Sequence, residues 1–266
     1  MQELTLALIQ TDIIWEDISG NLERIYPLVL SLQDKCDIVI LPEMFTTGFS
    51  MQTEMFAESP DGHTMTLIQD WSKKTGLAIC GSFICKDNNK YYNRAFFITP
   101  MQRFFYDKHH LFRMGAELLH FNAGEEQCMV TFKGWNISIQ ICYDLRFPVW
   151  CRNINNHYDL QIFMANWPTI RQSVWDVLLR ARAIENEAYV AGVNRIGSDG
   201  YGLKYSGGSV VADMKGEIIA SAPANEDAII LCTLQKSTLN NFREKFPTWM
   251  DADQFEIKAS SKNNMH

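Results

Sequence analysis

The sequence has no long apolar run, and no stretch approaches the roughly 18 residues that a membrane-spanning helix needs. It also has no basic start, because Gln2 and Glu3 lead directly into an alternating run, unlike a secretory signal peptide. Positive charge is scarce: 24 lysine and arginine residues stand against 31 aspartate and glutamate residues, a net charge of −7. We therefore expect neither a membrane nor a nucleic acid as a partner.

Cysteine occurs in an odd number and without regular spacing, which argues against a disulfide framework. The seven cysteines are scattered over positions 36, 80, 85, 128, 142, 151 and 232. None forms a CxxC pair, and no cysteine–histidine spacing resembles a zinc site. We expect a reduced, cytoplasmic protein with free thiols and with no metal or other cofactor.

Apolar residues are abundant: 47% of the 266 residues are hydrophobic and 12% are aromatic. This is enough for a sizeable core, so disorder is not expected. No internal repeat, low-complexity run or linker divides the sequence. We therefore predict a single domain over residues 1–256, followed by a polar, frayed tail over residues 257–266.

Strand and helix patterns are interleaved along the chain, which favours an α/β fold with mixed sheets. The helix expected over residues 174–187 has the clearest pattern, and its apolar stripe could meet the core or another copy of the chain. Strands are predicted at residues 4–10, 37–42, 77–84, 93–99, 103–107, 136–141, 160–165, 189–194, 209–213, 217–221 and 228–234, and further helices at 21–32, 64–74 and 237–243.

The stretch 136–148 organises the rest of the chain. Isoleucines alternate as in a strand over 137–141, Cys142 follows at once, and Pro148 suits the first turn of a helix. A thiol at such a sharp turn lies among unpaired backbone N–H groups, which lower its pKa and can bind an oxyanion. Cys142 is therefore a candidate nucleophile, and the alternative is an inert buried cysteine.

A cysteine nucleophile needs a base, and histidine is the usual one. None of the six histidines lies in a context that marks it as that partner. His109 and His110 are better explained as packing residues in a long loop over residues 109–127.

A carboxylate can replace histidine as the base when burial raises its pKa. Glu43 directly follows an apolar strand, and Lys108 follows another in the same way. Ligand sites in α/β sheets form at the carboxyl ends of strands. We therefore expect Glu43, Lys108 and Cys142 to meet at one site.

Three motifs resemble the signatures of one family. The stretches LPEMF at 41–45, YDKHHLF at 106–112 and ICYDLRFP at 141–148 are similar to those of the nitrilase superfamily, carbon–nitrogen hydrolases with a Glu-Lys-Cys catalytic set. The resemblance runs from residue 4 to about residue 255. Within the superfamily, MANWP at 164–168 and NRIGSDG at 194–200 resemble the bacterial omega-amidase branch, which hydrolyses 2-oxoglutaramate.

This resemblance implies a four-layer α-β-β-α sandwich with mixed sheets and a homodimer that pairs through helices. It also implies a role for each motif residue. Cys142 attacks the amide carbon, and Glu43 takes the thiol proton and later passes a proton to the departing ammonia. Lys108 and the backbone N–H of Tyr143 hold the oxyanion.

The family often has a second glutamate in the loop after the lysine. Glu117 fits that place, whereas its rivals Glu125 and Glu126 follow Gly124 and look like turn residues. The resemblance therefore adds Glu117 to the catalytic set.

A substrate carboxylate needs a cation or several hydrogen-bond donors. Arg171 is predicted for this role, and Arg195 is a second candidate. Either arginine could instead pair with a structural carboxylate such as Glu185 or Asp199. Arg146 is expected to form a buried ion pair with Glu185.

Phe45 and Trp167 are predicted to wall the substrate pocket beside Tyr143, although an aromatic near a strand end is more often a core residue. The resemblance implies a small-molecule substrate and hydrolysis of the terminal amide of 2-oxo dicarboxylic acid monoamides, namely 2-oxoglutaramate and 2-oxosuccinamate. The reaction passes through a cysteine thioester and yields the 2-oxo acid and ammonia. Two alternatives stay open: a nitrilase or N-carbamyl hydrolase of the same superfamily, and a non-catalytic binding module.

Overall fold

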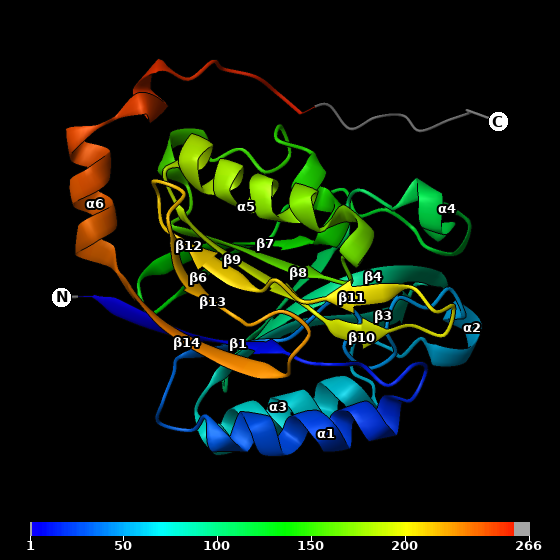
Figure 1. Ribbon diagram of the computed structural model, residues 1–266. Coiled ribbons are helices and arrows are strands. Elements are labelled where there is room, and N and C mark those ends of the chain that lie inside the picture. Colours follow the sequence, from blue (N-terminus) through cyan, green and yellow to red (C-terminus); the bar gives the residue numbers. More distant parts are fainter. Residues whose placement is uncertain (1, 258–266) are drawn as a thin grey trace.

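A computed structural model describes residues 2–257, so that most of the predicted polar tail, residues 258–266, lies outside the described residues. The chain is built in layers, which Figure 1 shows from bottom to top. Helices α1 (Ile18–Ser31) and α3 (His63–Thr75) form the lowest layer, two six-stranded sheets lie above them, and α5 (Gln172–Asn186) covers the top. The predicted four-layer α-β-β-α sandwich is confirmed.

The first sheet is mixed. Its strands follow the order β14 (Ala228–Gln235), β1 (Glu3–Gln10), β2 (Ile38–Ile40), β3 (Ala78–Asp87), β4 (Lys90–Ile98) and β5 (Arg103–Asp107). The pairs β1–β2 and β2–β3 are parallel, and the other pairs are antiparallel. A tight turn joins β3 to β4, with Asn88 and Asn89 both at positive φ.

The second sheet is also mixed. Its strands follow the order β13 (Ile218–Ser221), β12 (Val210–Ala212), β9 (Tyr189–Asn194), β8 (Leu160–Ala165), β7 (Trp135–Ile141) and β6 (Met129–Phe132). β7, β8 and β9 run parallel, and β8 and β9 are wholly buried. Such strands are covered on both faces, which explains their nearly continuous apolar sequences.

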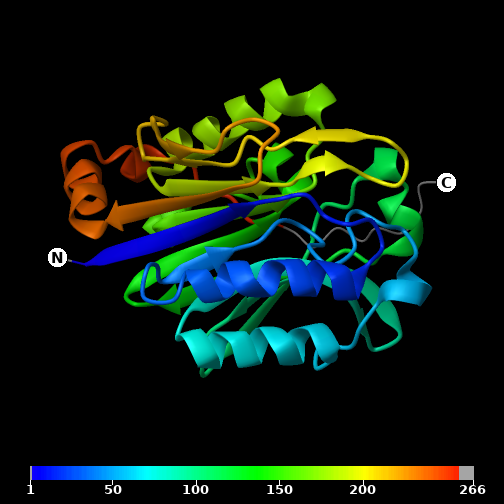
Figure 2. The same ribbon diagram turned by 60° about the horizontal axis from the view of Figure 1, so that its bottom comes forward.

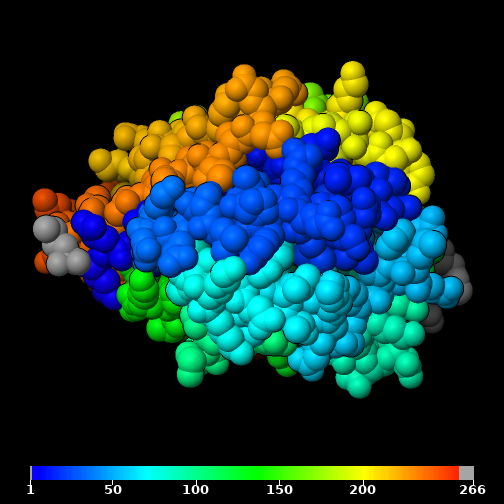
Figure 3. Space-filling view, turned by 90° about the horizontal axis from the view of Figure 1, so that it is seen from below, coloured from blue at the N-terminus to red at the C-terminus, as the bar shows by residue number. Residues whose placement is uncertain are grey.

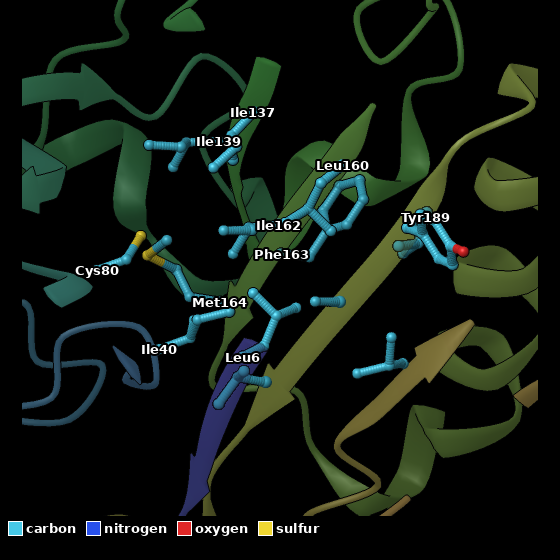
Figure 4. Close-up of a cluster of buried hydrophobic side chains, with 14 of the residues drawn as sticks. Leu6, Ile40, Cys80, Ile137, Ile139, Leu160, Ile162, Phe163, Met164 and Tyr189 are labelled. Atoms are coloured by element: carbon cyan, nitrogen blue, oxygen red, sulfur yellow. The ribbon is translucent and has the colours of Figure 1, made fainter. Parts of the chain in front are cut away.

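Apolar side chains from both sheets meet between them. Figure 4 shows Leu6 and Ile40 of the first sheet near Ile139, Ile162 and Met164 of the second. All five side chains are nearly inaccessible to solvent. This shared core fixes the two sheets against each other, and with them the strand ends that carry the polar residues.

Helices α1 and α3 lie side by side across the outer face of the first sheet (Figure 2). In the space-filling view of this side, the blue surface of α1 adjoins the cyan surface of α3 (Figure 3). α1 continues through Pro27 without a break. α3 ends at Thr75, and Gly76, with a φ of +76°, forms its C-cap.

The remaining elements are short or peripheral. α6 (Lys236–Lys245) follows β14 at one end of the molecule, near the N-terminus in Figure 1. A two-stranded hairpin, β10 (Ile196–Ser198) with β11 (Lys204–Ser206), stands apart from both sheets and was not predicted, because glycines interrupt its sequence. Among residues 2–257, no helix is both long and apolar enough to cross a membrane. The other helices are α2 (Thr53–Phe56), α4 (Glu117–His120) and the 3-10 helices Arg113–Gly115, Cys142–Arg146, Ile154–Asn156, Thr169–Arg171 and Thr248–Asp251.

Two predicted details of the second half are wrong. No helix begins at Pro148, because the chain after β7 forms a 3-10 helix that ends at Arg146, and Pro148 is exposed in the turn that follows. Helix α5 is present, but it buries Trp175 and Leu179, which lie off the expected apolar stripe. Members of that stripe point outward, and Ile184 is 52% exposed.

Candidate active site

Polar side chains from both sheets meet at one buried point. Glu43 follows β2 of the first sheet, Lys108 directly follows β5 of the same sheet, and Cys142 directly follows β7 of the second. The Nζ of Lys108 lies 2.9 Å from Oε1 of Glu43, and neither side chain is exposed. Cys142 interacts with both charges and lines a cavity together with Lys108. The structure thus brings together the three residues that sequence reasoning singled out.

Glu117 completes the buried charge cluster. Its carboxylate oxygens lie 3.1 and 3.0 Å from the Nζ of Lys108, and one of them accepts from the backbone N–H of Phe112 at 2.6 Å. Burial raises the pKa of Glu117, although Lys108 opposes that shift. Its rivals Glu125 and Glu126 are exposed, so the loop places only Glu117 among the three at the lysine.

Lys108 remains protonated in this environment. Burial by itself lowers the pKa of a lysine, but here the carboxylates of Glu117 and Glu43 raise it above its usual value of 10.5. A fixed ammonium in a site of low polarity is suited to stabilising a negative charge that develops on a substrate oxygen.

Two asparagines that sequence reasoning missed hold Glu43 in place. Asn93 donates from Nδ2 to Oε1 of Glu43 at 2.7 Å, and the backbone N–H of Asn166 donates to Oε2 at 2.8 Å. The side chain of Asn166 also donates to the carbonyl of Glu43 at 2.6 Å. Asn166 directly follows β8, so the strand-end rule that identified Glu43 could have found it. Asn93 lies inside β4 and has no comparable local signal.

Cys142 lies in a strained turn and is nearly inaccessible. Its φ is +44°, which is unusual for a residue other than glycine, and it is only 9% exposed. Burial, together with the charge of Glu43 and a hydrogen bond to it, raises the pKa of the Cys142 thiol well above 9.0. The expectation of a lowered pKa is therefore wrong, because burial and the charge of Glu43 outweigh the opposing charge of Lys108. The thiol is neutral at rest, and a neutral thiol needs a base before it can act as a nucleophile.

Tyr143 places a backbone N–H directly after Cys142. It lies in the first turn of the 3-10 helix Cys142–Arg146, where backbone N–H groups have no acceptor within the helix. The side chain of Tyr143 also lines the cavity, as predicted, and packs edge-on against Phe112.

The cavity beside Cys142 has two guanidinium groups in its wall. Arg171 lies over the ring of Phe112 at 5.4 Å, and Arg146 lies over the ring of Trp167 at 5.3 Å. Trp167 thus lines the cavity, as predicted. Within residues 2–257, no aspartate or glutamate lines this cavity. It therefore offers positive charge and aromatic surface to a small ligand.

Two sequence-based expectations about this wall are wrong. Phe45 is buried in the core against Phe96, at 6.0 Å between ring centres, and does not line the cavity. Glu185 pairs with Arg182 at 2.8 Å, because the two residues lie three positions apart on α5. Arg146 is therefore left facing the cavity.

Arg195, the second candidate for the substrate carboxylate, has a structural role. It is wholly buried and donates to the side chain of Asp12 at 2.7 Å and to the carbonyls of Ile13 and Ser198 at 3.0 Å each. These contacts tie the hairpin β10–β11 to the segment after β1. Among the described residues, no group of three or more histidine, cysteine, aspartate or glutamate side chains could hold a metal ion.

Known proteins share both the sequence and this fold. The chain matches the carbon-nitrogen hydrolase family over residues 5–244. The omega-amidase YafV of Yersinia enterocolitica is 43% identical over 256 residues, which cover 96% of this chain and 99% of that protein. The 2-oxoglutaramate amidase of Bacillus subtilis is 30% identical over 255 residues, which cover 93% of this chain and 96% of that protein.

A solved structure extends the agreement to three dimensions. XC1258 from Xanthomonas campestris, a CN-hydrolase superfamily protein with an arsenic adduct in its active site, matches with a TM-score of 0.95. It is 41% identical, and the match covers 97% of this chain and 100% of that chain. Motifs, fold and relatives agree, and this chain belongs to the carbon–nitrogen hydrolase family of the nitrilase superfamily, in which it is a hydrolase of amide carbon–nitrogen bonds.

Proposed function

We propose that this amidase hydrolyses the terminal amide of 2-oxo dicarboxylic acid monoamides, namely 2-oxoglutaramate and 2-oxosuccinamate, through a cysteine thioester. The observation that carries the proposal is Cys142 beside the buried pair of Glu43 and Lys108, at a cavity with two guanidinium groups in its wall. The names of the relatives, omega-amidase and 2-oxoglutaramate amidase, support this choice of substrate.

In this mechanism the reaction begins with the neutral thiol. Glu43 takes the proton from Cys142 as the sulfur attacks the amide carbon. The carbonyl oxygen becomes an oxyanion, which accepts from the Nζ of Lys108 and from the backbone N–H of Tyr143. Glu43 then passes its proton to the nitrogen as the C–N bond breaks, so that ammonia leaves and a thioester remains.

Water completes the cycle. Glu43 takes a proton from a water molecule that attacks the thioester carbon, and the same two donors hold the second oxyanion. The C–S bond breaks, the sulfur recovers its proton from Glu43, and the 2-oxo acid leaves. Glu117 stays beside Lys108 throughout and balances its charge.

The far end of the substrate carries a carboxylate and a 2-oxo group, which Arg171 and Arg146 are suited to bind. Both guanidinium groups are held over aromatic rings, and Arg146 has no ion-pair partner among residues 2–257. Guanidinium groups bind carboxylates through paired hydrogen bonds. An ammonium group at the same place, as in glutamine, meets only positive charge. The cavity therefore favours a 2-oxo acid over a 2-amino acid.

The test is ammonia release from 2-oxoglutaramate, 2-oxosuccinamate, glutamine, pentanamide and pentanenitrile, with an N-carbamyl amino acid as a further substrate. We expect kcat/KM for the two 2-oxo amides to exceed that for glutamine and pentanamide by at least about tenfold, because only they match the two guanidinium groups. Turnover of the nitrile or the N-carbamyl compound, with none of the 2-oxo amides, contradicts the proposal and favours another branch. No turnover of any compound favours a binding module.

We also propose a homodimer that pairs through α5. Val177 and Ile184 on its outer face are 65% and 52% exposed, and Val174, Leu178 and Ala181 extend the same stripe. Burying such a stripe against a second copy is favourable. Light scattering should give twice the chain mass of 30.6 kDa, and Val177→Asp combined with Ile184→Asp should give a monomer. A monomeric wild-type protein at micromolar concentration contradicts this assembly.

A cytoplasmic location is part of the same proposal. All seven cysteines are free thiols, and one of them is the proposed nucleophile. A reducing compartment keeps such thiols unoxidised. Activity in the cytoplasmic fraction of cells that express the protein supports this location, whereas activity confined to an exported fraction contradicts it.

A further inference from the structure

Asp144 is a wholly buried carboxylate that the mechanism above does not use. Its Oδ2 accepts from the hydroxyl of Tyr106 at 2.8 Å and from the backbone N–H of Ile141 at 3.1 Å. Its Oδ1 accepts from the backbone N–H of His110 at 2.9 Å and lies 2.9 Å from Nδ1 of the same residue. That nitrogen is the donor, because an ionised carboxylate can only accept. Both oxygens are thus fully engaged by the protein.

The donors to Asp144 come from the two segments that carry the catalytic side chains. Tyr106 and His110 flank Lys108 at the end of β5, in the first sheet. Asp144 itself lies two residues beyond Cys142, at the end of β7 in the second sheet. The carboxylate therefore joins the segment that carries the ammonium to the segment that carries the thiol.

Aromatic rings also pack between these two segments. His110 stacks on Phe147 with ring centres 3.6 Å apart, and His109 stacks on Trp150 at 3.7 Å. The indole N–H of Trp150 donates to the hydroxyl of Tyr106 at 3.0 Å. Tyr106 and Trp150 are 2% and 5% exposed, so solvent does not compete with these contacts.

Tyr106 remains a hydrogen-bond donor at neutral pH. Burial and the charge of Asp144 raise the pKa of its hydroxyl well above 10.0. A hydrogen bond from a hydroxyl to a carboxylate is stronger than one between neutral groups. The bridge between the two segments is therefore a strong one.

We propose that Asp144 is a positioning residue which, through Tyr106 and His110, sets the separation between Lys108 and Cys142 that the oxyanion requires. The inference rests on the proposed oxyanion hole, which takes its ammonium from one segment and its backbone N–H from the other. Its geometry depends on the spacing of the two segments. At a reacting centre, a misplacement of about 1 Å can lower the rate by about 10²-fold.

The test compares Tyr106→Phe, Asp144→Asn and the double variant, using the amide that the wild-type enzyme hydrolyses best. Tyr106→Phe removes the bridging hydroxyl alone and leaves the bond from Ile141 to Asp144 in place. We expect kcat to fall about tenfold in Tyr106→Phe and about 100-fold in Asp144→Asn, with KM changed by less than about twofold. The double variant should be no slower than Asp144→Asn, because the proposed effect of the Tyr106 hydroxyl is exerted through Asp144.

Tyr158→Phe is the matched control. Tyr158 is 3% exposed, and its hydroxyl donates to the carbonyl of Cys151 at 2.6 Å instead of bridging the two catalytic segments. Tyr158→Phe should lower Tm about as much as Tyr106→Phe does, while kcat stays within about twofold of the wild-type value.

Three outcomes overturn the proposal: an unchanged kcat in Tyr106→Phe, losses that multiply in the double variant, or an equal loss of kcat in Tyr158→Phe. Where Asp144→Asn fails to fold, Tyr106→Phe and its control decide the matter. Failure of the substrate proposal gives a different result: the wild-type enzyme releases ammonia from an amide other than the 2-oxo amides. The same variants are then compared on that amide.

Discussion

The Nζ of Lys108 lies 3.0 Å from Oε2 of Glu117, and neither side chain is exposed to solvent. Because Glu43 is the second partner of the same ammonium at 2.9 Å, two carboxylates share one buried positive charge. Glu117 shares the charge of Lys108 with Glu43, so that Lys108 does not pair with Glu43 alone. A buried charge without such a partner is strongly unfavourable.

Glu117→Gln should therefore slow catalysis without preventing substrate binding. Lys108 is then paired with Glu43 alone, which holds Glu43 in the ion pair and hinders it from taking the thiol proton. We expect kcat to fall by about 10²-fold with little change in KM, measured by steady-state ammonia release. Glu125→Gln changes an exposed glutamate of the same loop and should leave kcat unaltered. Equal activity of both variants would rule out the role given to Glu117.

Cys142→Ala should abolish ammonia release while the fold survives. The side chain is small and lies beside a cavity, so its removal disturbs little packing. We expect a loss of more than about 10⁴-fold in kcat, as for other nucleophiles that are removed, with an unchanged circular dichroism spectrum. Cys36→Ala, at a half-buried cysteine beyond α1, should retain full activity. Turnover by the Cys142 variant would remove the thioester mechanism.

Arg171→Gln and Arg146→Gln should alter specificity more than chemistry. Each removes one guanidinium from the cavity wall, so kcat/KM for 2-oxoglutaramate should fall by about 10- to 100-fold. Hydrolysis of pentanamide, which has no carboxylate, should change by less than about threefold. Arg113→Gln, at an exposed arginine, is the control. Parallel losses on both substrates would indicate a structural role for the two arginines.

Gly124→Ala should loosen the loop that carries Glu117. The N–H of Gly124 donates to the carbonyl of Lys108 at 3.0 Å, and a Cβ at this position would lie only 2.1 Å from the carbonyl oxygen of Asp107. Backbone atoms must move to relieve that contact, at a cost of about 1–3 kcal/mol. We expect a lower Tm by calorimetry together with a lower kcat. Gly76→Ala is the control: a Cβ there would meet no atom within 4 Å, so its positive φ should lower Tm while kcat stays unchanged.

Stability should decline in alkaline solution because of buried thiols. Burial raises the pKa of Cys36 and Cys85 to about 12 and that of Cys128 to about 11, from 9.0. The folded state therefore holds these protons more tightly than the unfolded state. Their contribution to stability is complete below about pH 9 and is lost progressively up to about pH 12.

Calorimetry should accordingly show Tm falling more steeply between about pH 9 and 11 than between about pH 7 and 9. Cys128→Ala removes one of these groups and should make the alkaline decline shallower. A Tm that does not change up to about pH 11 contradicts the assignment of these shifts to folding.

Local sequence patterns predicted the parts of the site that follow strands. Glu43, Lys108 and Cys142 each come after a run whose apolar or alternating pattern marks a strand, and the structure brings the three together. The layered α/β fold followed from the same patterns and from the family motifs. These features depend on residues that are close in sequence, which is why they could be predicted.

Contacts between distant segments could not be predicted in this way. Asn93 reaches Glu43 from the interior of a strand, where nothing in the sequence distinguishes it. Glu185 was assigned to the distant Arg146, but it pairs with Arg182, which lies three positions before it on α5. Phe45 was misplaced because its side chain turns to the core beneath the first sheet. The pKa of Cys142 depends on burial, which no motif reveals.

The thiol of Cys142 and the ammonium of Lys108 are attached to different sheets. The contact between these sheets is mainly apolar and non-directional. Such a contact tolerates small sliding far better than a catalytic constellation does. The rate of catalysis therefore depends closely on how the two sheets are aligned. We expect mildly destabilising conditions to abolish the activity of the enzyme while its helix content is unchanged.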